Sequence, residues 1–160
     1  FDDRMNADPA TPFVAQFVDR NAEVLWTPTL QVTDVRTQVA PYLDGMRNLM
    51  LGGAKVRGVG LAAPQVGLSL SFFITTLDGL RVVVNPVITG HSTNKVSKQE
   101  GCLSWNGGES RIYVARWAWI RVLFTDHHGT SHATILHDWR ARVFQHEADH
   151  LEGKNIFSRA

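Results

Sequence analysis

Gln145-His146-Glu147-Ala148-Asp149-His150 is the stretch that decides how this chain is organised. It lies within residues 138–152, whose apolar spacing predicts a helix. Residues four apart lie one above the other on the same helical face, so His146 and His150 can reach one metal ion. Glu147 then lies beside the ion, where it can take a proton from water. A solvated helix with two incidental histidines is the alternative interpretation of this spacing.

A third ligand must come from upstream of this helix. Catalytic metal sites commonly use three protein ligands and a water molecule, yet the residues after His150 offer only Glu152, which is too close on the helix. The candidate is Cys102, the one cysteine, within Glu100-Gly101-Cys102-Leu103-Ser104. A small buried hydrophobe is the alternative role for a lone cysteine. Its place beside a glutamate, between two predicted hairpins, favours a thiolate ligand.

A third segment of interest reads Gly-Val-Gly-Leu-Ala-Ala-Pro-Gln over residues 58–65. Its small residues allow a close backbone approach, and Gln65 offers an amide donor. The alternative is a glycine-rich turn that leads into a strand. The two glycines lack the further spacing of a dinucleotide-binding loop.

The rest of the chain predicts helices at both ends and hairpins between them. Residues 68–77 and 80–88 flank Asp78-Gly79, and residues 118–126 and 130–137 flank His127-His128-Gly129. A short helix is expected from Thr11 and Pro12, and an amphipathic helix over 34–51 that Pro41 divides in two. In the last helix Asp138 is the expected cap, and Gly153 ends it. The residues expected to be its apolar members are Trp139, Val143, Phe144 and Leu151.

These elements predict one α+β domain over residues 1–160, with antiparallel or mixed sheets around the metal-binding helix and residues 1–24 as a peripheral segment. The chain has 160 residues, 44% hydrophobic and 19% charged, which excludes a disordered protein. A net charge of +1 gives no reason to expect nucleic acid or an anionic membrane as a partner.

No run approaches the ~20 apolar residues of a membrane span. A single cysteine and the absence of a secretory signal favour a reducing compartment, although a removed targeting segment stays open.

Taken together, the three segments resemble the peptide deformylase family in their order and spacing, and the resemblance extends over about residues 25–156. It implies a metal-dependent hydrolase that removes the formyl group from N-terminal formyl-Met of nascent polypeptides and releases formate. It also implies the fold of that family, built around the metal-binding helix.

The resemblance implies a role for each site residue. Cys102, His146 and His150 correspond to the metal ligands, and Glu147 to the general base and then acid. Gln65 and the backbone N–H of Leu103 correspond to the oxyanion donors. The substrate-binding residues would be Val59, Gly60, Gly101 and Arg111, with surface charge as the alternative for Arg111. Asp149 and Arg116 are expected to form an ion pair that fixes the helix, and residues 105–110 form a longer turn than the family usually has.

The implied cofactor is one divalent ion, natively Fe²⁺, for which Zn²⁺, Ni²⁺ or Co²⁺ can substitute. The implied partners are formyl-Met nascent peptides, with the ribosome left open, and the expectation is a cytoplasmic monomer. The short C-terminal end resembles compact or virus-encoded members, which would place the protein in a host cytoplasm. Two other functions stay open: a metalloprotease, which would need a downstream ligand that is absent, and an inactive deformylase-like module.

Overall fold

Two antiparallel sheets form the frame of the molecule. The computed structural model describes residues 13–52, 58–102, 104 and 111–159. In this part of the chain the five-stranded sheet has the order β1-β2-β3-β6-β7, and β4 and β5 form a second sheet. The strands are β1 (Gly60–Ala62), β2 (Phe72–Thr75), β3 (Val82–His91), β4 (Lys95–Gly101), β5 (Arg111–Trp117), β6 (Trp119–Thr125) and β7 (Ser131–His137). The α+β class with antiparallel sheets is therefore confirmed.

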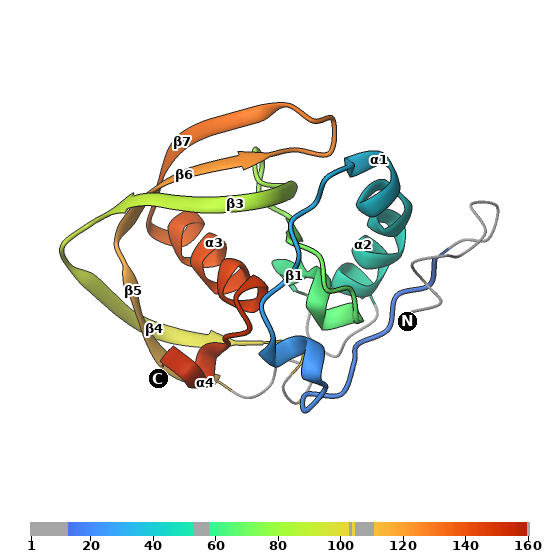
Figure 1. Ribbon diagram of the computed structural model, residues 1–160. Coiled ribbons are helices and arrows are strands. Elements are labelled where there is room, and N and C mark those ends of the chain that lie inside the picture. The colour runs from blue at the N-terminus through green and yellow to red at the C-terminus, as the bar shows by residue number, and fades with distance from the viewer. Residues whose placement is uncertain (1–12, 53–57, 103, 105–110, 160) are drawn as a thin grey trace.

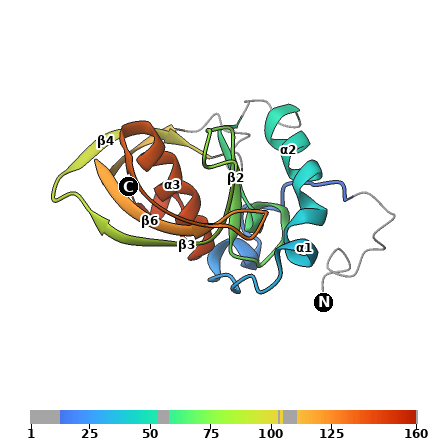
Figure 2. The ribbon, with the colours of Figure 1, turned by 90° about the horizontal axis from the view of Figure 1, so that it is seen from above.

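Helices pack on both sides of this frame. They are α1 (Val35–Gln38), α2 (Leu43–Gly52), α3 (Asp138–Leu151) and α4 (Ile156–Arg159), with 3-10 turns η2 (Glu23–Trp26), η3 (Ala40–Tyr42) and η4 (Ala63–Val66). In Figure 1, α3 lies between β3, β6 and β7 on one side and β4 and β5 on the other. Figure 2 shows α1 and α2 at the opposite end from the β3–β4 connection.

The core is divided between these two helical regions. One apolar cluster joins α2 to β1 and β2 through residues such as Met46 and Phe72, which are fully buried. The other joins α3 to β2, β3 and β6, and the Phe73 and Phe144 rings meet edge to face at 5.3 Å. α3 is buried against the sheet on one side. This packing fixes the position of its opposite side, which carries His146 and His150.

The two hairpins predicted from turn signals are present. β2 pairs with β3, and β6 pairs with β7, both antiparallel. Gly79 and Gly129 have φ angles of 78° and 81° in the connecting turns, a left-handed conformation that favours glycine. Asp126 also fixes the second turn, because its side chain accepts the N–H groups of His128 and Thr130.

The division of the 34–51 helix at Pro41 is confirmed as well. α1 ends at Gln38, and the chain passes through the short η3 turn, which contains Pro41, before α2 begins. A proline lacks the N–H that an unbroken helix would need at this point. At the start of α1, the Asp34 side chain accepts the Arg36 N–H at 3.0 Å.

The expected helix at the start of the chain is wrong for the residues that can be compared. Thr11 and Pro12 lie outside the described residues, but residues 13–18 form no regular element. Phe13 instead packs edge to face on Tyr42 at 5.0 Å, and the Val18 N–H donates to the Gln65 carbonyl. The segment is held by contacts of individual residues with the core rather than by a helical ladder.

Two details of α3 also differ from expectation. Asp138 is not the cap: it is the first helical residue, His137 precedes it as N-cap, and no side chain makes a capping hydrogen bond. Trp139 is 52% exposed and so is not a core residue, whereas Val143, Phe144 and Leu151 are buried. Trp139 lies in the first turn of the helix and lines a cavity rather than the core.

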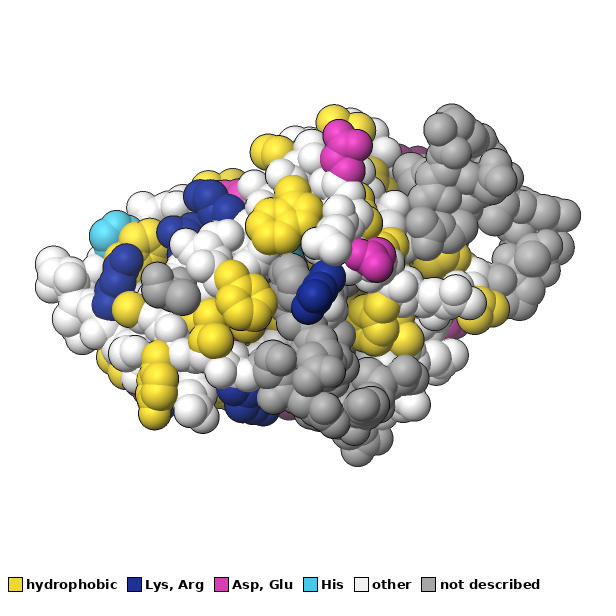
Figure 3. All heavy atoms as spheres, turned by 90° about the horizontal axis from the view of Figure 1, so that it is seen from below, with side chains coloured by type: hydrophobic (Ala, Val, Ile, Leu, Met, Phe, Trp, Pro, Cys, Tyr) yellow, Lys and Arg dark blue, Asp and Glu magenta, His cyan; other side chains and the backbone are white. Residues whose placement is uncertain are grey.

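The surface agrees with the composition. None of the helices in the described part of the chain is long and apolar enough to cross a membrane. Figure 3 shows the molecule from below, and on this face hydrophobic side chains are interspersed with Lys, Arg and polar side chains.

Candidate active site

The three predicted ligands converge in the structure. The ligand atoms of Cys102, His146 and His150 all lie within 4.8 Å of one another, and among the described residues no other group of three such side chains does so. α3 supplies both histidines one turn apart, and Cys102 directly follows β4. Cys102 Sγ lies 3.3 Å from His150 Nε2. One thiolate and two imidazoles form a donor set that suits a transition-metal ion and leaves a fourth position open.

The environment of Cys102 favours the thiolate form that a ligand needs. The side chain is 3% exposed. Burial alone would raise the pKa of the thiol, but the nearby imidazoles of His150 and His146 lower this pKa to about 5. The sulfur is therefore deprotonated at neutral pH, as metal ligation requires.

Glu100 fixes the orientation of His146. Its Oε1 lies 2.8 Å from His146 Nδ1, and Arg116 donates to both carboxylate oxygens at 2.9 and 3.0 Å. Burial would raise the pKa of Glu100, but the hydrogen bonds from His146 and Arg116 outweigh it and lower the pKa to about 2. Because an ionised carboxylate only accepts, His146 donates from Nδ1, and Nε2 is the ring nitrogen that an ion would take.

The expected ion pair between Asp149 and Arg116 is present. Arg116 is buried and bridges Asp149 and Glu100. Asp149 also accepts from Arg159 of α4 at 3.0 Å. This network ties α3 to β4, β5 and α4. It holds the helical face with the two histidines against the β4–β5 hairpin, in which Cys102 directly follows β4.

A hydrogen bond to the backbone orients the side-chain amide of Gln65 toward Cys102. It is 1% exposed in the η4 turn, and its Oε1 accepts the Ala62 N–H at 2.9 Å. The amide Nε2 must therefore point the other way, where it lies 3.5 Å from Cys102 Sγ and donates to Ser104 Oγ at 3.0 Å. This places a neutral donor at the edge of the metal site.

Glu147 lies on the other side of the ligands. Its Oε1 is 3.7 Å from His146 Nε2, and its Oε2 is buried with no hydrogen-bond partner among the described residues. Burial is the main cause that raises the pKa of this carboxyl group. A buried carboxylate with a raised pKa and one unsatisfied oxygen has the properties of a general base.

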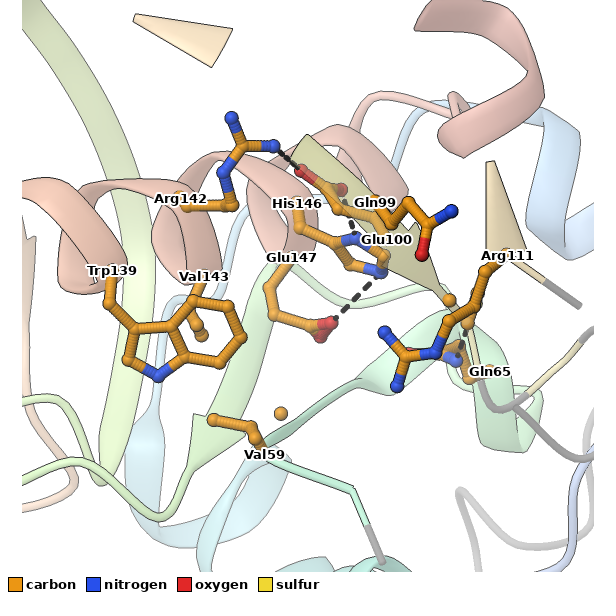
Figure 4. Close-up of a pocket in the computed structure, with 13 residues that line it drawn as sticks. Val59, Gln65, Gln99, Glu100, Arg111, Trp139, Arg142, Val143, His146 and Glu147 are labelled. Atoms are coloured by element: carbon orange, nitrogen blue, oxygen red, sulfur yellow. Dashed lines mark hydrogen bonds and ion pairs between the residues drawn. The ribbon is translucent and has the colours of Figure 1, made fainter. Parts of the chain in front are cut away.

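A cavity of about 120 Å³ opens beside these residues. Figure 4 shows Val59, Trp139 and Arg111 around Glu147 and His146. The predicted substrate-binding residues all line it, namely Val59, Gly60, Gly101 and Arg111. Gly60 packs directly against the Glu147 side chain.

Comparison with known proteins assigns this arrangement to a family. The polypeptide deformylase family matches residues 14–160. The chain belongs to this family. Peptide deformylase 1 of Bifidobacterium longum is 36% identical over 137 residues, which are 76% of this chain and 60% of that protein. The peptide deformylase of Treponema pallidum is 37% identical over 130 residues, which are 81% of this chain and 77% of that protein.

A solved deformylase has the same fold. The crystal structure of peptide deformylase from Thermotoga maritima superposes with a TM-score of 0.84 at 32% identity, over 92% of this chain and 97% of that one. Membership of the deformylase family makes this chain a hydrolase that removes the N-terminal formyl group from nascent peptides. The family also implies a divalent metal ion, which the Cys102, His146 and His150 cluster fits.

Sequence reasoning left part of this deformylase site unassigned. Leu103 and the turn over residues 105–110 lie outside the described residues. In the sequence Glu100 stands out only as a neighbour of Cys102, and no motif links Arg142 or Trp139 to the site. The available signal was the alternation along residues 98–102, which places Glu100 and Cys102 on the same side of a strand.

Proposed function

We propose that Cys102, His146 and His150 hold one divalent ion, natively Fe²⁺, at which this deformylase hydrolyses the formamide of formyl-Met peptides. The convergence of their ligand atoms within 4.8 Å is the observation that carries this proposal. When bound, the ion lowers the pKa of a coordinated water toward about 7 and so supplies hydroxide at neutral pH. Zn²⁺, Ni²⁺ and Co²⁺ suit the same donors.

Glu147 moves the proton. Its Oε1 lies 3.7 Å from His146 Nε2, the ring nitrogen proposed to hold the ion, so the carboxylate takes a proton from the attacking water. The protonated carboxyl group then donates that proton to the departing amine, which leaves as the free N-terminus. The raised pKa of Glu147 supports both steps. It brings the free energies of the ionised and the protonated carboxyl group closer together near neutral pH.

Gln65 stabilises the negative charge that develops on the formyl oxygen when the formyl carbon is attacked. Its Nε2 is held at the edge of the site by the contact of Oε1 with Ala62. The backbone N–H of Leu103 is the second proposed donor, on the strength of the family resemblance. A donor of this kind contributes about 3 kcal/mol to the transition state.

The formylated peptide enters beside β1. This strand is the end strand of the five-stranded sheet, so its outer edge can pair with an extended backbone at Val59 and Gly60. Gly101 and Arg111 pair with each other on the opposite side of the cavity, at the ends of β4 and β5. The ribosome as a partner, a monomeric state, a cytoplasmic location and one catalytic domain stay predictions.

Formate release tests the proposed function. Protein purified without oxygen and loaded with Fe²⁺ should release formate from a formyl-Met tripeptide and little acetate from the acetyl-Met peptide. Glu147→Gln should retain the ion and lose at least ~100-fold in turnover. No formate from a folded, metal-loaded sample would favour the inactive module, and cleavage of an internal peptide bond would favour a protease.

A further inference from the structure

Arg142 is a buried arginine that the reaction described above does not use. It lies on α3 one turn before His146 and is 5% exposed. Its Nη1 contacts Glu100 Oε2 and donates to the Val114 carbonyl at 3.0 Å, and its Nη2 contacts the Val96 carbonyl. One guanidinium therefore binds β4, β5 and the carboxylate that holds a metal ligand.

The contacts of Glu100 show what this arginine adds. Oε1 accepts from His146 and from Arg116 Nη2, and Oε2 accepts from Arg116 Nε and from Arg142. A carboxylate offers about four acceptor positions, so this one is fully used. The Arg116 fork fixes the plane of the carboxylate from β5. Arg142 adds a contact to Oε2 from α3, and so ties the carboxylate to the helix that carries His146.

The direction of the side chain separates Arg142 from the reacting groups. Arg142 is one of the residues that line the cavity, but in Figure 4 its guanidinium points toward Glu100 and away from Val59 and Glu147. It therefore acts on the site through Glu100 rather than on the substrate. Glu100 in turn acts on Nδ1 of His146, which is the ring nitrogen opposite the one free for an ion.

We propose that Arg142 is a positioning residue for metal binding: by fixing Glu100, it holds His146 with Nδ1 protonated and Nε2 turned to the ion. The proposal rests on the role of His146 as a ligand in the proposed function. Outer partners of this kind commonly change metal affinity by 10- to 100-fold. A purely structural role, in which Arg142 only ties α3 to the β4–β5 hairpin, would change stability and leave metal affinity alone.

Arg142→Met and Arg142→Lys test the proposal, with Arg140→Met as the matched control. Arg140 is on the same helix but is only partly buried, and it donates to the Asp78 carbonyl at the β2–β3 turn. Three quantities are measured: the zinc dissociation constant in competition with a chelator, the ¹⁵N shifts of the His146 ring in zinc-loaded protein, and the urea midpoint of metal-free protein. Cys102→Ala serves as the reference for a missing ligand.

Arg142→Met should weaken zinc binding by roughly 10- to 100-fold and shift the Nδ1 resonance, while Arg140→Met matches the wild type. If Arg142→Met does not fold, Arg142→Lys decides, since it keeps the charge and loses the fork; weaker zinc binding with a wild-type urea midpoint supports the proposal. A lower urea midpoint with zinc affinity within threefold of wild type overturns it. Wild-type zinc binding no tighter than that of Cys102→Ala would instead refute the ligand assignment of the proposed function.

Discussion

Gly60 lies so close to Glu147 that a Cβ at position 60 would stand 2.9 Å from both Cγ and Cδ of the glutamate. The contact joins the end strand β1 to the helix that carries the metal ligands. Glycine is required here for space and not for backbone conformation, because Gly60 is absent from the glycines with positive φ. The position of Glu147, the proposed base on α3, thus depends on the absence of a Cβ at position 60 of β1.

Gly60→Ala should therefore displace Glu147 and lower turnover by about 100-fold, since errors near 1 Å at a reacting group have this cost. The metal content should not change, because no ligand is touched. Turnover of formyl-Met peptide and metal content by elemental analysis measure the two quantities. Gly52→Ala is the control, since nothing lies within 4 Å of a Cβ there. Wild-type turnover in Gly60→Ala would contradict the placement of Glu147.

Gln65→Glu should distinguish the role of the accepting oxygen of Gln65 from the role of its donating nitrogen. The substituted carboxylate still accepts the Ala62 N–H but no longer donates toward Cys102. We expect kcat to fall by 10²- to 10³-fold with a smaller change in KM, because the donor acts on the transition state. Ser104→Ala, which removes a partner of the same amide, should change kcat far less. A kcat within threefold of wild type in Gln65→Glu would remove this residue from the oxyanion site.

Cys102→Ala should lose tight metal binding. The thiolate is one of the three proposed ligands, and its loss leaves two imidazoles from one helix. Metal content after dialysis against a chelator should fall from about one ion per chain to near zero. Affinity in the wild type should also fall on acidification, because protons compete for the sulfur and the imidazoles. An unchanged stoichiometry in Cys102→Ala would rule out Cys102 as a ligand.

The contribution of Asp126, in the turn between β6 and β7, to the free energy of unfolding should depend on pH. Burial would raise the pKa of Asp126, but hydrogen bonds from His132 and from the N–H groups of Thr130 and His128 lower it to about 2. A pKa below the unfolded value of 3.8 means that the stabilisation is complete above pH 3.8 and is lost as pH falls toward 2. Urea unfolding of wild type and Asp126→Asn should therefore differ most at pH 6, and the difference should disappear only as pH falls to about 2. A constant difference from pH 6 to pH 3 would contradict this pKa shift.

Local signals explain what the sequence could predict. Ligands one turn apart on a helix, Pro41 within a helical pattern and glycines in tight turns each determine structure within a few residues. His146 and His150 carry such a local signal, whereas Cys102 and Gln65 are predicted from segments elsewhere in the chain. The structure brings these four side chains together.

The β4–β5 hairpin was missed because its signal is weak. Residues 95–99 are all exposed, and the connection to β5 contains residues 105–110 rather than a two-residue turn. The contacts of Arg142 depend on this hairpin, so they could not be read from the chain. Trp139 was misplaced because helical periodicity does not show which apolar side chain lines a cavity rather than the core.

The shortness of β1 has a kinetic consequence. Within the described residues this strand is three residues long and pairs only with β2. A peptide added to its outer edge gains a few main-chain hydrogen bonds, each of about 1 kcal/mol net. Binding of that size lies nearer the millimolar than the nanomolar range, so the residence time of a finished product is brief. A longer edge would hold peptides more tightly and would leave the enzyme saturated with its own product.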